Sequence, residues 1–167
     1  RAQAQWSMQF PDVQGTSQEH VVEGRKFMRQ DTVVGYRRAD EHFRRALLVD
    51  VSNKDAIAAY VENYANLPNV SARSDPEGVA LAFEGLDYVL VQDPHNAMLN
   101  RAYGALKLAL GEVDEAQRYL AQATRVAPDD AEAKLLLARA QVDRDTKEAL
   151  RLVELVQRQD PGLKAAL

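Results

Sequence analysis

The sequence contains no cysteine, and it also lacks any long run of apolar residues. The absence of cysteine excludes disulfide bonds, thiolate catalysis and metal sites built on cysteine. Since no stretch of about 18 consecutive apolar residues occurs, we expect no helix that spans a membrane. The 167 residues are 46% hydrophobic and 28% charged, which is the composition of an ordinary globular domain with a substantial core.

Sequence motifs of enzymes are also missing. The chain has no glycine-rich phosphate loop, no HExxH zinc motif and no GxSxG nucleophile motif. Its three histidines, His20, His42 and His95, have no spacing typical of metal ligands. A net charge of −4, with seven acidic and two basic residues between positions 51 and 100, argues against binding to a nucleic-acid backbone. We therefore expect no catalysis, no metal, no cofactor and no nucleic-acid partner.

What the sequence does have is a repeat of small residues and prolines. In the clearest unit Gly104 is followed by Ala116 after 12 residues, by Ala123 after 7 more and by Pro128 after 5 more. The intervals of 7 and 5 recur in three further sets, which are Gly24, Ala39, Ala46 and Val51; Val61, Ala82, Val89 and Pro94; and Ala138, Ala149, Val156 and Pro161. The three prolines lie 34 and 33 residues apart, and self-similarity at this period is typical of stacked helix pairs.

Small residues at these positions allow two antiparallel helices to approach closely. A larger residue follows four positions after the first small residue of each second helix, and we expect it to fill the space beside the pair; these residues are Phe43, Leu86, Leu120 and Val153. The skeleton from Gly104 to Pro128 resembles the tetratricopeptide repeat. This resemblance implies an all-α fold, a right-handed superhelix of about four helix-turn-helix repeats. The short repeats, and an excess of arginine over lysine of 15 to 6, are similar to those of bacterial members.

The expected organisation has three parts. Residues 1–16 are predicted to form an extended linker or N-terminal arm, because Trp6, Met8 and Phe10 alternate with polar residues. This arm either rests on the first helix pair or docks into a groove as a self-inhibitory peptide. The repeat domain covers 17–162, with units at about 17–53, 54–96, 97–130 and 131–162, and 163–167 begins a truncated capping helix.

Local signals predict where the helices of the repeat domain begin and end. Asn53 is expected to cap one helix, and Asp75 followed by Pro76 is expected to begin the next. The helices are expected at 17–29, 36–49, 54–66, 77–92, 97–110, 114–126, 130–142 and 146–159, with a turn at 30–35.

The resemblance also implies a protein partner, because the first helices of stacked pairs line a concave surface that binds segments of other proteins. The candidate partner-binding residues on that surface are Arg25, Met28, Arg29, Asp55, Glu62, Met98, Arg101, Leu108, Leu135 and Arg139. Their mixture of arginine and apolar side chains suits a peptide with acidic and apolar groups. The inserted loop at 67–76 is a second candidate site, with Asn69 and Arg73.

The function that we expect is that of a non-enzymatic scaffold. By analogy with bacterial repeat domains, it would recruit a partner in a secretion, pilus or envelope assembly, or a motility or signalling complex. Two alternatives stay open: a structural module that stacks into homo-oligomers through its repeat ends, and an accessory domain of a larger enzyme. The compartment is unknown from the sequence, with the cytoplasm favoured over the periplasm.

Overall fold

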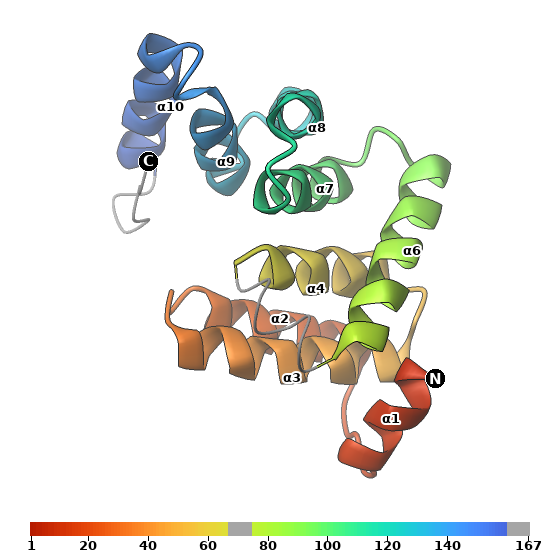
Figure 1. Cartoon of the computed structure of the whole chain (residues 1–167). Helices are drawn as coiled ribbons and strands as arrows, with labels where there is room; N and C mark the ends of the chain where they lie inside the picture. The colour runs from red at the N-terminus through yellow and green to blue at the C-terminus, as the bar shows by residue number, and fades with distance from the viewer. Residues whose placement is uncertain (67–74, 160–167) are drawn as a thin grey trace. The chain divides into compact units, whose positions relative to one another are not determined.

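The computed structural model describes residues 1–66 and 75–159, and every regular element in these two ranges is a helix (Figure 1). The helices are α1 (Ala2–Gln9), α2 (Ser17–Met28), α3 (Val33–Val49), α4 (Lys54–Asn66), α6 (Pro76–Gln92), α7 (Ala97–Ala109), α8 (Val113–Val126), α9 (Ala131–Gln141) and α10 (Thr146–Gln159). The predicted all-α, repeat-like fold is confirmed, and the handedness of the superhelix stays a prediction. The proposed loop residues Asn69 and Arg73, and the capping helix from 163, lie outside the described residues.

The N-terminal segment differs from the prediction. An extended arm was wrong for Ala2–Gln9, which form the helix α1. The alternating residues mislead because Trp6 and Phe10 are also four apart, which places them on one face of a helix. Trp6 is fully buried on that face, whereas Met8 is 78% exposed on another.

The helices begin where polar side chains satisfy their free backbone N–H groups. Asn53 caps α4 as predicted, since its Oδ1 accepts hydrogen bonds from the N–H groups of the first turn at 2.9 and 3.2 Å. Asp75 caps α6 in the same way, with its Oδ1 3.0 Å from the N–H of Gly78. The prediction of a turn up to residue 35 was wrong, because Thr32 accepts from the N–H of Gly35 at 3.0 Å and begins α3 three residues early.

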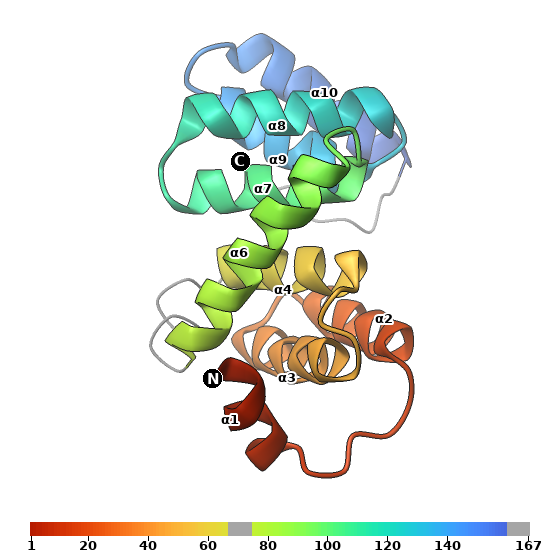
Figure 2. The same ribbon diagram turned by 90° about the vertical axis from the view of Figure 1, so that its right-hand side faces the viewer.

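The chain divides into two compact units, Arg1–Gln92 and Asp93–Leu167. In the first unit α2 pairs with α3, and α4 lies at the centre because α2, α3 and α6 all contact it. Residues Ala56 to Tyr64 of α4 are accordingly all buried. Helix α1 contacts α3 and α6, next to the beginning of α6 (Figure 2).

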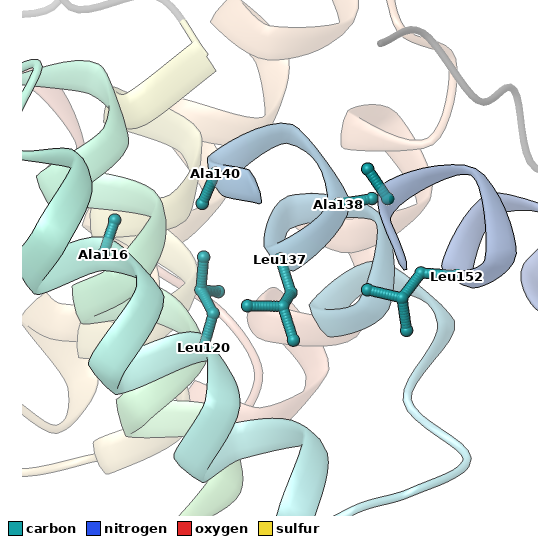
Figure 3. Close-up of a cluster of buried hydrophobic side chains, with 7 residues drawn as sticks. Ala116, Leu120, Leu137, Ala138, Ala140 and Leu152 are labelled. Carbon is teal, nitrogen blue, oxygen red and sulfur yellow. The ribbon is translucent and has the colours of Figure 1, made fainter. Parts of the chain in front are cut away.

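In the second unit each helix from α7 to α10 packs on its neighbour in sequence. Figure 3 shows the core between α8, α9 and α10, where Leu137 lies between Leu120 and Leu152. The glycines of the repeat pattern lie at the close approaches. A Cβ at Gly104 would lie 2.5 Å from Cγ of Leu120, and a Cβ at Gly24 would collide with the ring of Phe43.

The large residues predicted to fill the space beside each pair do so. Phe43, Leu86 and Leu120 are fully buried, and Val153 packs half-buried against the core of the second unit. The small and large residues of the repeat therefore lie where neighbouring helices pack against each other.

Candidate functional site

Within the first unit, the predicted binding residues lie on two first helices that contact each other, α2 and α4. Arg25 of α2 and Glu62 of α4 are brought together, with Nη1 and Oε2 3.1 Å apart. Their side chains are only 25% and 6% exposed, so this ion pair links the two helices. Met28 and Asp55 are half-buried, and Arg29 is exposed at the end of α2.

Within the second unit, Arg101 of α7 is only 9% exposed. Its Nη1 lies 2.8 Å from Oδ2 of Asp130 and 3.2 Å from Oε2 of Glu132. Asp130 also caps α9, because its Oδ1 accepts from the N–H of Ala133 at 2.9 Å. Arg101 therefore ties one repeat to the start of the next, a role that its sequence position did not indicate.

The remaining candidates of the second unit differ in their exposure. Leu108 packs against the core cluster, and Met98 and Leu135 are half-buried. Arg139 is exposed on α9. Among the predicted arginines, Arg29 and Arg139 are thus the two that the structure exposes, while Arg25 and Arg101 take part in ion pairs between helices. The role of all ten residues in binding stays a prediction.

Sequence reasoning missed a buried polar cluster in the first unit. Its centre is the carboxylate of Asp75, which is 1% exposed. Oδ2 of Asp75 accepts a hydrogen bond from the indole Nε1 of Trp6 at 2.6 Å and from the hydroxyl of Tyr60 at 3.3 Å. Burial raises the pKa of the Tyr60 hydroxyl far above its usual range, so this group stays a donor.

The cluster extends through Arg44 of α3, whose Nη1 lies 3.9 Å from Oδ2 of Asp75 and which forms an ion pair with Asp40. Burial raises the pKa of Asp40, against the opposing effect of the Arg44 charge. For Arg44, burial acts to lower the pKa, but the Asp40 carboxylate outweighs it and the pKa is raised. The hydrogen bonds and ion pairs of this cluster join α1, α3, α4 and the start of α6, which suits holding helices together.

A second feature that the sequence did not predict is a histidine pair between α2 and α3. The Nδ1 atoms of His20 and His42 are 3.4 Å apart, and Nε2 of His20 donates to the carbonyl of Gln14 at 2.9 Å. His20 is thereby left with Nδ1 as an acceptor, so His42 is the donor of the pair. Burial lowers the pKa of His42, and the charges of Arg45 and His20 lower it further. Across residues 1–66 and 75–159, no group of three or more metal-ligating side chains occurs.

These helix pairs, with glycine or alanine at each close approach, define a helical-repeat protein. Comparison with family models places the repeat in one family: residues 79–140, from within α6 to within α9, match the tetratricopeptide repeat. This match confirms, for residues 79–140, the resemblance to that family that the pattern of small residues and prolines predicted. No curated protein matches it. None of the described helices has both the length and the apolar character that a membrane crossing requires.

Proposed function

We propose that this chain is a non-enzymatic scaffold that recruits a partner protein through the face lined by its first helices. Tetratricopeptide repeats generally mediate protein–protein interaction. The observation that carries the proposal is that first helices of successive pairs contact each other, α2 with α4 in the first unit and α7 with α9 in the second. Within each unit, first helices that touch in this way form a continuous surface on which an extended or helical segment can lie.

The chemistry of the partner follows from the candidates that stay accessible. In the first unit Arg29 is an exposed cation beside the half-buried Met28 at the end of α2. In the second unit Arg139 is an exposed cation on α9, where Leu135 is half-buried, and Met98 is half-buried on α7. A segment that combines acidic and apolar residues fits the set of either unit, because arginine binds carboxylates through paired hydrogen bonds and methionine adapts to apolar surfaces. The assembly that we propose for it is a bacterial secretion, envelope or signalling complex, supported by the resemblance of the repeats.

The test is a pull-down from a bacterial lysate with the wild-type chain and an Arg29→Glu, Arg139→Glu variant, with retained proteins identified by mass spectrometry. The matched control is Arg118→Glu, Arg151→Glu, which makes the same charge change on the second helices α8 and α10, at side chains that are 73% and 66% exposed. We expect one partner to be retained by the wild type and the control and lost by the first variant.

A partner retained by all three proteins would place the binding surface elsewhere and contradict the proposal. Sedimentation of the purified chain over a range of concentrations accompanies the pull-down. A mass that rises with concentration, together with no retained partner, would favour the homo-oligomer instead.

A further inference from the structure

Helix α1 is attached to the first unit through few of its residues. Only Ala2 and Trp6 are buried in its eight residues, its first turn has no acidic residue, and no side chain caps its beginning. A hollow of about 440 Å³ lies along it, between Arg1 to Gln3 and residues Glu77 to Glu84 of α6. Since isolated helices of this length are unstable in water, α1 is helical because it is docked.

The main anchor of α1 is Trp6, the single tryptophan of the chain. Its indole ring lies 6.0 Å from the ring of Tyr60, and its Nε1 donates to the buried Asp75 carboxylate at 2.6 Å. The ring occupies the space above Gly78, where a Cβ would collide with both the indole and the carboxylate. Binding hot spots typically consist of a fully buried aromatic side chain, often tryptophan, that fills a closely fitting pocket, and Trp6 has these features.

Two further side chains, those of Gln9 at the end of α1 and of Phe10, which follows it as the C-cap residue, meet arginines of α3. The Phe10 ring lies 4.3 Å from the guanidinium carbon of Arg45, and Arg44 donates to Oε1 of Gln9 at 3.1 Å. Positions 6, 9 and 10 are spaced i, i+3 and i+4, which is the spacing with which a groove recognises a helix. None of these three residues belongs to the repeat pattern.

We propose that the surface formed by α3, α4 and the beginning of α6 is a helix-docking site that α1 fills as an intramolecular ligand. The partner that fits it is a helix of another protein with the same chemistry: a tryptophan, followed three and four residues later by an amide and an aromatic side chain. The tryptophan supplies the N–H for Asp75, and the aromatic ring stacks on Arg45. The short connection between α1 and α2 keeps α1 at a millimolar-range effective concentration near this site. A partner helix must therefore displace α1 in order to bind. This site is separate from the proposed scaffold function, because it uses neither Arg29 nor Arg139.

The test uses the full chain with Trp6→Ala, which contains no tryptophan, and a synthetic peptide of residues 1–10. The peptide brings the only tryptophan into the mixture, so a blue shift of its emission reports entry into the buried slot. We expect binding to this variant. The comparisons with the wild type, which has its own tryptophan, and with a Trp6→Ala peptide, which has none, use the anisotropy of fluorescein-labelled peptides. We expect binding about tenfold or more weaker to the wild type, where α1 competes, and none for the Trp6→Ala peptide. Adding Gly78→Val to the variant closes the slot, whereas Gly85→Ala on the same helix is the control that leaves it open. A variant with native circular dichroism that does not bind the peptide would overturn the proposal.

If Trp6→Ala does not fold, a chain with a protease site inserted between Pro11 and Asp12 replaces it. After cleavage, an excess of fluorescein-labelled peptide is added, and entry into the chain is followed by anisotropy. Exchange of α1 for the labelled peptide supports the proposal. Failure to exchange, or unfolding on cleavage, would mean that α1 is a fixed part of the fold. A wild-type dimer that forms by exchange of α1 would name a second copy as the occupant and overturn the assignment of a foreign helix.

Discussion

The same substitution, glycine to alanine, is expected to have opposite effects at two helical positions. Alanine in place of glycine stabilises a helix interior by about 0.5–1 kcal/mol, because the unfolded chain loses conformational freedom. At Gly85 of α6 the added Cβ would lie 3.4 Å from Cδ1 of Ile57, which is an ordinary contact. Gly85→Ala should therefore stabilise the first unit by about 0.5–1 kcal/mol.

At Gly104 of α7 alanine would stabilise the helix by the same amount, but there is no room for its Cβ. The Cβ would lie 2.5 Å from Cγ and 2.7 Å from Cδ2 of Leu120. Leu120 is fully buried in the cluster of Figure 3, so it has no open side toward which to move. Overpacking of a filled core costs about 1–3 kcal/mol, which exceeds the helix gain. We expect Gly104→Ala to destabilise the second unit by about 1 kcal/mol net.

Urea unfolding with two probes distinguishes the effects. Trp6 fluorescence reports the first unit, and far-UV circular dichroism reports both. Gly85→Ala should raise the fluorescence midpoint, and Gly104→Ala should lower the circular dichroism transition while it leaves the fluorescence midpoint unchanged. In a thermal melt, 1 kcal/mol corresponds to about 4–8 °C for a unit of this size. If Gly104→Ala raised the stability as Gly85→Ala does, the argument that glycine is needed for close helix approach would be refuted.

Two further predictions concern charged groups. In the folded state the pKa of His42 lies below its ordinary 6.5, mainly because of burial and then because of the charges of Arg45 and His20. The free energy of unfolding should therefore be highest above pH 6.5 and should decline as the pH falls toward and through the lowered pKa of His42. Urea midpoints between pH 8 and 5 should show this decline in the wild type and a smaller one in His42→Gln; parallel curves would contradict it. Asp130→Ala should destabilise the second unit by about 1–3 kcal/mol, because it removes a helix cap and a partner of the mostly buried Arg101. Asp130→Asn keeps the cap and should lose about half as much, as measured by thermal unfolding, and equal losses would show that the cap contributes nothing.

The parts of the fold that the sequence predicted depend on local signals. Gly24 and Gly104 could be identified because the two helices of each repeat approach closely at the same position, and a small residue recurs there. The caps Asn53 and Asp75 could be identified because a cap depends on its own side chain and the next few backbone groups. Helix α1 was missed because no neighbouring repeat exists with which to compare it.

The candidate site was predicted less well, because it depends on contacts distant in sequence. Arg25 and Glu62 are 37 residues apart, and Trp6 and Asp75 are 69 apart. Which side chains meet across two helices depends on their axial shift and rotation, and a single sequence does not define these. An arginine on a first helix therefore looked the same in sequence whether it was exposed, as Arg29 is, or paired, as Arg25 is.

The separation between Trp6 and Asp75 also sets an order of events during synthesis. A ribosome that adds 5–20 residues per second requires between about 3 and 14 s to proceed from the tryptophan to its acceptor. During that interval α2, α3 and α4 can already pair, whereas α1 has neither the Asp75 carboxylate nor the Gly78 slot. The nascent chain thus presents the tryptophan of α1 without its binding slot until α6 emerges. Molecules that act on nascent chains can therefore meet this segment before the finished protein conceals it.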